Sequence, residues 1–136
     1  MKVTLFGSPS LSTRKAKEWL RNHEIAFVER DIKKYPITAN ELQNILRLTE
    51  YGTDEIIATR SKIYKELAID FDSLSLNELL QLFQQYPGLL RNPIIIDEKR
   101  IQIGFNEDDI RQFLPRKTRE YIWSKWKMEN LLLADG

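Results

Sequence analysis

The chain has 136 residues, 30% of them charged, and its 21 basic side chains nearly balance 20 acidic ones, giving a net charge of +1. This balance excludes a protein that coats nucleic acid through bulk charge, so any DNA contact is local or guided by a partner. The absence of cysteine excludes disulfides and thiol chemistry. No apolar run suits a membrane span, and the polar start does not suit a signal peptide. We therefore expect a cytoplasmic protein without membrane contact, metal or cofactor.

The first thirty residues predict a strand, a helix and a second strand. Residues 3–6 are apolar enough for a strand, and residues 27–28 lie in another. Between them, Ser12 or Thr13 is expected to cap a helix that continues through residues 19–20. The residues expected near one face of this helix are Ala16, Trp19, Leu20 and His23. The pattern indicates a βαβ unit.

Residues 36–87 lose the strand composition and predict a wholly helical insert. Thr38 and Glu41 have the spacing of a capping box ahead of an apolar helical run. Ser75 is placed to cap the last helix of the insert, and Pro87-Gly88 marks the end of the insert.

The stretch from residue 90 to residue 115 predicts a β-hairpin followed by a helix. Residues 94–96 are three isoleucines, residues 97–100 form a charged turn, and residues 101–103 alternate between apolar and polar. Asn106 is expected to cap a helix whose first turn is acidic. Pro93 is a candidate for a cis peptide bond.

A set of motifs follows one another along this chain. They are Thr49-Glu50-Tyr51-Gly52-Thr53-Asp54-Glu55-Ile56-Ile57, Thr59-Arg60-Ser61-Lys62, Arg91-Asn92-Pro93-Ile94, Asp97-Glu98-Lys99-Arg100 with Gly104, and Phe113-Leu114-Pro115-Arg116. In order and spacing they resemble the Spx branch of the Spx and arsenate-reductase (ArsC) family. The resemblance covers residues 1–117 and implies an α/β fold, a thioredoxin-like mixed sheet with a helical insert at about 36–87. Residues 118–136 are then expected to form a C-terminal helix and tail.

The chain departs from the family in the loop after the first strand, which carries one or two cysteines in the family and Cys-x-x-Cys in many Spx proteins. Here the degenerate loop reads Ser10-Leu11-Ser12-Thr13. An unassisted hydroxyl is a very weak nucleophile near neutral pH, and no base is evident beside it. We expect no catalytic residue here but a helix cap, although the helix start remains able to bind an anion.

The resemblance implies a partner surface built from Arg47, Leu48, Gly52 and Arg60, where Spx proteins dock the C-terminal domain of the RNA polymerase α subunit. A glycine allows two backbones to approach closely. The alternative is that Gly52 is an ordinary C-cap glycine. Lys62 is a candidate for contact with a promoter phosphate once the complex is on DNA.

Arg60 and Arg91 match the arginines that hold the oxyanion in arsenate reductases, a task suited to a bidentate guanidinium. Without a thiol to attack the oxyanion, neither has a reductase role here. Arg60 is a candidate for binding, and Arg91, beside Pro93, is expected to be structural.

Near the C-terminus, Trp123, Trp126 and residues 131–133 are expected to pack back on the domain or to contact a protease adaptor or a second protomer. Spx proteins are typically controlled by ATP-dependent proteolysis through this tail. The ending Ala134-Asp135-Gly136 departs from the small apolar ending that such proteases favour, so proteolytic control is an open question.

The resulting hypothesis is a non-enzymatic, redox-insensitive stress-response regulator of transcription. It would bind the C-terminal domain of the RNA polymerase α subunit and reach promoter DNA only indirectly. Two alternatives from other classes remain: an arsenate-reductase-type enzyme, and a degenerate oxyanion-binding module that uses Arg60, Arg91 and the start of the first helix.

Overall fold

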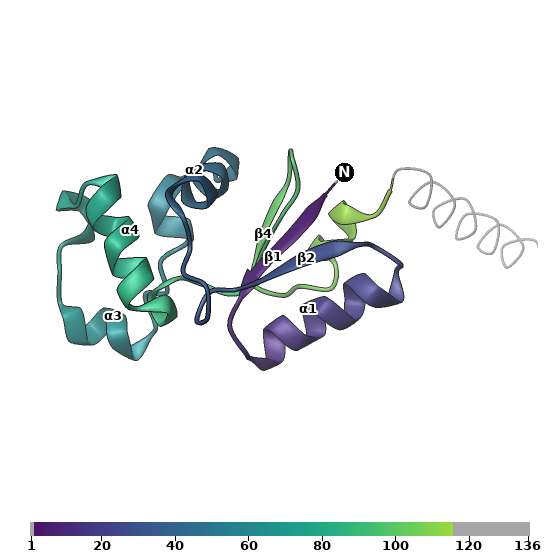
Figure 1. The fold of residues 1–136 in the computed structure, drawn as a ribbon, viewed down its shortest axis with the longest axis horizontal. Helices are drawn as coiled ribbons and strands as arrows, with labels where there is room; N and C mark the ends of the chain where they lie inside the picture. The colour runs from purple at the N-terminus through teal and green to yellow at the C-terminus, as the bar shows by residue number, and fades with distance from the viewer. Residues whose placement is uncertain (1, 116–136) are drawn as a thin grey trace, which may run out of the picture.

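The computed structural model describes residues 2–115 and contains one mixed sheet in the order β2-β1-β3-β4. Strand β1 (Val3–Gly7) pairs in parallel with β2 (Phe27–Asp31) and antiparallel with β3 (Ile94–Ile96). Strand β3 forms a hairpin with β4 (Ile101–Ile103). Helix α1 lies along one face of the sheet (Figure 1). The predicted βαβ unit and hairpin are therefore confirmed.

Helix α1 (Leu11–Asn22) begins earlier than the sequence predicted. Ser10 is its N-cap: the Ser10 backbone is extended, and its hydroxyl accepts from the Thr13 N–H at 3.1 Å. The expectation that Ser12 or Thr13 is the cap was wrong, because both already lie in the first turn. Ala16, Trp19 and Leu20 are buried as expected.

The insert is helical as predicted. It consists of α2 (Ala39–Leu48), α3 (Lys62–Leu67) and α4 (Leu76–Gln85), together with the 3₁₀ turns η1 (Gly52–Glu55), η2 (Phe71–Ser73) and η3 (Pro87–Leu89). The two predicted helix starts are confirmed, since Thr38 with Glu41 and Ser75 with Glu78 each form a complete capping box. The insert lies beyond the ends of β1 and β2 (Figure 1).

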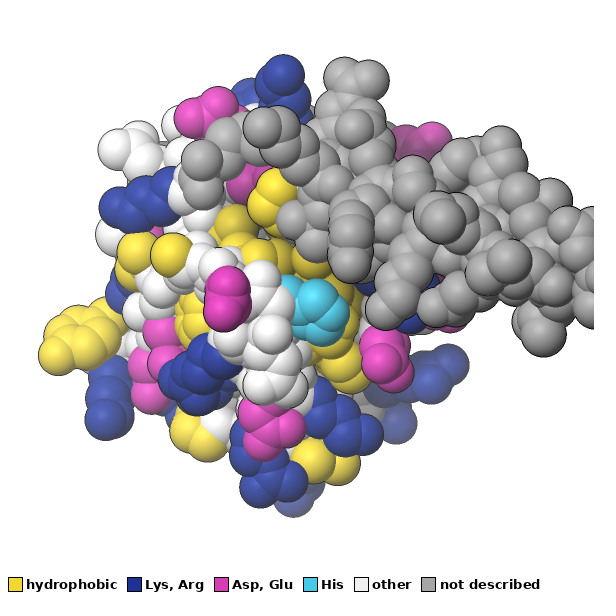
Figure 2. Space-filling model, turned by 90° about the vertical axis from the view of Figure 1, so that its right-hand side faces the viewer, with side chains coloured by type: hydrophobic (Ala, Val, Ile, Leu, Met, Phe, Trp, Pro, Cys, Tyr) yellow, Lys and Arg dark blue, Asp and Glu magenta, His cyan; other side chains and the backbone are white. Residues whose placement is uncertain are grey.

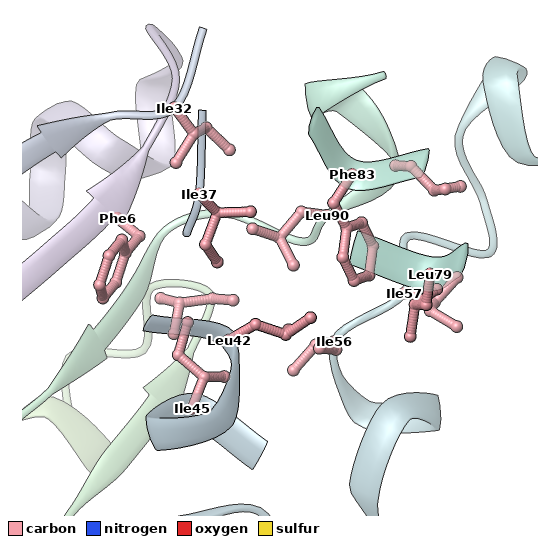
Figure 3. Close-up of a cluster of buried hydrophobic side chains, with 12 residues drawn as sticks. Phe6, Ile32, Ile37, Leu42, Ile45, Ile56, Ile57, Leu79, Phe83 and Leu90 are labelled. Carbon is pink, nitrogen blue, oxygen red and sulfur yellow. The ribbon is translucent and has the colours of Figure 1, made fainter. Parts of the chain in front are cut away.

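Two hydrophobic clusters form the core, because successive strand residues point to opposite faces of a sheet. Leu5 and Ile95 belong to the cluster under α1, while Phe6 and Ile94 belong to the cluster shared with the insert. Figure 3 shows the insert cluster, with Leu90 lying between the sheet and α4. The strands β1 and β3 therefore connect α1 to the insert.

The segment after β4 differs from expectation. Asn106 does accept from the N–H groups of Asp108 and Asp109, at 2.9 and 3.2 Å. The element that follows is a 3₁₀ helix, η4 (Asp109–Phe113), and not the expected α-helix. Its buried residues Ile110 and Phe113 are three positions apart, a spacing that places both on one side of a 3₁₀ turn.

The peptide bond between Asn92 and Pro93 is cis, as the motif suggested. Of the helices that the structure describes, none has the length and apolar character needed to cross a membrane. The C-terminal helix expected around Trp123 and Trp126, the residues 131–133 and the boundary at residue 117 all lie outside the described residues.

Candidate functional site

The chain turns sharply after α2, and residues 47–60 form what is called the corner below. Thr49 ends α2, and its hydroxyl donates to the carbonyl of Leu46 at 2.7 Å. The same hydroxyl oxygen accepts from the N–H of Gly52 at 3.1 Å. The N–H of Tyr51 donates to the Glu55 carboxylate at 2.6 Å. The corner is therefore an ordered turn held by short-range hydrogen bonds.

Gly52 begins η1 with a φ of +81°, in the left-handed region that favours glycine. A Cβ built on Gly52 would have no heavy atom within 4 Å, so a side chain here would point into open space. The alternative that Gly52 caps α2 is wrong, because Thr49 is the C-cap. Gly52 instead provides the left-handed backbone conformation that the turn requires. Because it has no side chain, nothing projects from the surface of the turn at this position.

The other candidate residues are distributed around this corner. Arg47 is exposed and donates to the backbone carbonyl of Glu98, in the β3–β4 turn, at 3.2 Å, while Leu48 is half-buried. Arg60 is exposed, and within residues 2–115 no hydrogen bond or ion pair involves its side chain. Lys62 on α3 has 90% of its side chain exposed and approaches Glu66 at 3.7 Å. Arg60 and Lys62 are thus available to a partner.

The corner is attached to the strand-like segment 89–93. The N–H of Arg91 donates to the carbonyl of Ile56, and the N–H of Ala58 donates to the carbonyl of Leu89, both at 2.8 Å. The Arg91 guanidinium also donates to the carbonyl of Glu55 at 3.3 Å. Arg91 is therefore engaged with the backbone of the corner.

Arg60 and Arg91 line one cleft, and the start of α1 lines a second cleft. Both arginines line one cleft of about 630 Å³. Ser10, Leu11 and Thr13 line another, of about 410 Å³, to which Ser12 does not contribute. The elements of the hypothetical oxyanion module therefore lie in two clefts.

A residue that the sequence analysis did not select connects the two clefts. Asn92 lines the cleft of the arginines, and its side-chain oxygen also accepts from the hydroxyls of Ser10 and Thr13, each at 3.2 Å. The local signal was weak: Asn92 lies within the Arg91-Asn92-Pro93-Ile94 motif, next to the candidate cis-proline, and nothing else in the sequence marks it.

Within residues 2–115, no hydrogen bond joins the Ser10 or Thr13 hydroxyl to a general base. The carboxylates of Glu29 and Asp31 line the same cleft, but Glu29 pairs with Lys17 and Asp31 accepts from the Lys33 N–H. His23 is the C-cap at the opposite end of the helix, where its ring stacks on Trp19 with centroids 4.0 Å apart. Figure 2 shows the single histidine against hydrophobic side chains, with acidic and basic side chains mixed over the same face. Among the residues placed by the structure, no group of His, Asp and Glu is arranged to hold a metal ion.

A partly buried ion pair between Arg30 and Glu41 anchors α2, the helix that leads into the corner. The Arg30 guanidinium on β2 donates to both oxygens of Glu41, at 2.7 and 2.6 Å. These hydrogen bonds, opposed by partial burial, lower the pKa of Glu41 and raise that of Arg30. Glu41 also accepts from the Thr38 N–H in the capping box, so one carboxylate joins α2 to the sheet and caps the helix.

The fold and this site define a thioredoxin-like α/β protein with a helical insert and no thiol at the start of its first helix. The model of the ArsC family matches residues 6–113. A global transcriptional regulator Spx 2 from Oceanobacillus iheyensis is 57% identical over 129 residues, which cover 95% of this chain and 96% of the relative. The Spx regulator of Streptococcus pneumoniae is 62% identical over 119 residues, covering 87% and 90%. The chain belongs to the ArsC family, in the branch of the Spx regulators.

Solved structures agree with the fold. An arsenate reductase from Vibrio cholerae is 22% identical and superposes with a TM-score of 0.66, covering 84% of this chain and 96% of that protein. A protein from Staphylococcus aureus is 24% identical with a TM-score of 0.70, covering 83% and 99%. At these identities, the similarity establishes the thioredoxin-like fold and carries no functional assignment.

Proposed function

We propose that this protein is a non-enzymatic regulator of transcription that acts in the cytoplasm by binding the C-terminal domain of the bacterial RNA polymerase α subunit. The observation that carries the proposal is the bare corner at Gly52, where a left-handed glycine faces open space. A partner backbone can approach such a position closely because no side chain intervenes. Relatives at 57% and 62% identity are named global transcriptional regulators, which supports a regulatory role.

The side chains around Gly52 suit a protein partner. Tyr51 is 75% exposed, and Arg60, nine positions further along the chain, is also exposed. Aromatic residues and arginine are the side chains that most often contribute large binding energies at interfaces. Lys62 extends into solvent nearby in the chain, where it would contact a phosphate of promoter DNA only after the partner has positioned the protein.

The start of α1 supports the non-enzymatic part of the proposal. Acyl or oxyanion chemistry needs an activated nucleophile, and the chain has no cysteine to provide a thiolate. The Ser10 and Thr13 hydroxyls are engaged with each other and with Asn92, and His23 is at the other end of the helix. These hydrogen bonds hold both hydroxyls in place within the fold, and none of them joins a hydroxyl to a general base.

Calorimetric titration with purified α C-terminal domain tests the proposal, and Gly52→Arg is the decisive variant. We expect a one-to-one complex with the wild type and a loss of roughly a hundredfold or more in affinity for Gly52→Arg, because the new side chain occupies the approach path. Gly104→Arg is the matched control. Gly104 has a φ of +82° and the same open surroundings but lies after β4, so it carries a similar backbone cost of about 1 kcal/mol.

Circular dichroism checks that both variants fold. A folded Gly52→Arg protein that binds like the wild type would refute the docking site. A wild-type protein that does not bind the α domain at all would refute the proposed function.

A further inference from the structure

Three polar side chains join the start of α1 to the segment that holds the corner. The Thr13 hydroxyl donates to the side-chain oxygen of Asn92 at 3.2 Å. The Ser10 hydroxyl lies 3.2 Å from the same oxygen and 3.0 Å from Thr13 Oγ1, and shares its single proton between these acceptors. Ser10, Thr13 and Asn92 are called the hydroxyl–amide cluster below.

Thr13 is the fixed member of the cluster. Its side chain is buried, and the residue is 3% exposed. A Cβ added to Gly7 would lie 3.0 Å from Thr13 Oγ1 and 3.2 Å from its methyl carbon. The Thr13 side chain therefore packs directly over the backbone of β1, and this packing fixes the direction in which its hydroxyl donates.

Asn92 transmits this position to the corner through its neighbour in the chain. Arg91 donates from its backbone to the carbonyl of Ile56 at 2.8 Å and from its guanidinium to the carbonyl of Glu55 at 3.3 Å. These two carbonyls lie at the end of η1, the turn that starts at Gly52. On the other side of Asn92, the carbonyl of Pro93 accepts from the N–H of Gly104 at 2.7 Å.

We propose that the hydroxyl–amide cluster is a positioning element for the corner: Ser10 and Thr13 hold Asn92, and thereby Arg91, where η1 requires them. This inference deepens the proposed function and rests on it as far as the partner is concerned. Hydroxyl and amide groups neither titrate near neutral pH nor form disulfides. The cluster therefore keeps the docking surface in one permanent shape.

Thr13→Val is the first test, because valine keeps the branched shape of threonine and removes its hydroxyl. Two readouts are measured: the affinity for the α C-terminal domain, and the backbone amide resonances of Gly52, Glu55 and Arg91. We expect the affinity to fall about fivefold, which corresponds to about 1 kcal/mol. We also expect the three resonances to move, although they belong to residues distant from position 13 in the sequence.

A double-mutant cycle identifies the shared bond. Asn92→Ala should reduce affinity by a similar factor and move the same resonances. Adding Thr13→Val to Asn92→Ala should have little further effect, because both changes remove the same hydrogen bond. Fully additive losses would show that the two residues act separately and would overturn the inference.

Two further variants separate positioning from general stability. Ser12→Ala removes a neighbouring exposed hydroxyl outside the cluster and should change neither readout. Thr13→Ser keeps the hydroxyl and loses a buried methyl, so it should lower the stability while leaving the corner resonances near those of the wild type. Corner resonances that follow stability, and not the hydroxyl, would overturn the inference.

The tests of the positioning role can fail independently of the proposed binding to the α C-terminal domain. If the wild type does not bind the α domain, the proposed partner is wrong, but the resonances still decide whether the cluster positions the corner. A folded Thr13→Val protein with unchanged resonances at Gly52, Glu55 and Arg91 refutes the positioning role. If Thr13→Val does not fold, Asn92→Ala, whose side chain is half-buried, decides by the same two readouts.

Discussion

The start of α1 and the corner after α2 are both polar segments, but their side chains are used in opposite ways. At the start of α1, the Ser10 and Thr13 hydroxyls are engaged inside the protein, with each other and with Asn92. At the corner, Tyr51 is 75% exposed, and the exposed Arg60 side chain forms no hydrogen bond with residues 2–115. Gly52 has no side chain, and the space beside its Cα is open.

The difference separates a structural polar site from a candidate binding site. Polar groups that satisfy one another within a fold have little to offer a ligand without breaking those bonds first. Polar and aromatic groups that face solvent can form new contacts at a lower cost. In a family in which the loop before α1 is the expected reactive site, this comparison moves the candidate functional surface of this chain to the corner.

Substitution of the two arginines that line the cleft at the corner, Arg60 and Arg91, should sharpen this comparison most. Arg60→Ala should weaken binding to the α domain by about 2 kcal/mol, roughly thirtyfold, because exposed arginines are frequent interface hot spots. Its free energy of unfolding should change by less than about 0.5 kcal/mol. Arg91→Ala should instead lower the free energy of unfolding by about 1 kcal/mol, since its guanidinium donates to the carbonyl of Glu55.

Calorimetric titration and urea denaturation on both variants supply the measurements. The comparison breaks if the pattern is reversed, with Arg60→Ala destabilising the fold and leaving affinity intact.

The support of the corner can be tested through the two capping boxes of the insert. Glu41 and Glu78 occupy the same position in their boxes, but Glu41 also receives two hydrogen bonds from Arg30. Glu41→Gln should therefore lower the free energy of unfolding by about 1–2 kcal/mol. Glu78→Gln, at a fully exposed carboxylate, should have the smaller effect.

The ion pair between Arg30 and Glu41 predicts that the free energy of unfolding depends on pH. The Arg30 hydrogen bonds lower the pKa of Glu41 below its ordinary value of 4.5 in the folded state. The resulting stabilisation is complete above the unfolded pKa and is lost as the pH falls through the lowered, folded pKa. Denaturation curves below pH 4.5 should therefore converge for the wild type and Glu41→Gln. A constant difference between the curves would show that the charge of Glu41 is not responsible.

Features that depend on neighbouring residues could be predicted from the sequence. The capping box at Thr38 was identified correctly because it is defined by two residues three positions apart. Ser75 was identified correctly as the cap of its helix, and its partner Glu78 became visible in the structure. The hairpin of β3 and β4 was also identified correctly, because its isoleucines flank a charged turn. The parallel pairing of β1 and β2 followed from the βαβ pattern.

Features that depend on contacts between distant segments could not be predicted. Ser10, Ser12 and Thr13 all carry hydroxyls near the start of α1, and local propensity does not choose among them. The structure identifies Ser10 as the N-cap through its extended backbone and its hydrogen bond from the Thr13 N–H. Asn92 lies 79 positions from Thr13, so their hydrogen bond has no local signal. The exposed state of Arg60, in contrast to the engaged state of Arg91, is likewise a product of the tertiary fold.

The smallest expected effect is the response to oxidants. The chain has no cysteine, so neither diamide nor dithiothreitol can change a disulfide within it. The groups proposed to position the corner are hydroxyls and an amide, which these reagents do not modify. The affinity for the α domain should therefore be the same in both reagents, measured by titration of one preparation split in two. A several-fold difference would mean that another group acts as a switch, and the chain's two methionines would be the first residues to replace. Such a result would also contradict the comparison of the two regions. Binding at the corner would then depend on a redox-active group, and the hydroxyl–amide cluster contains none.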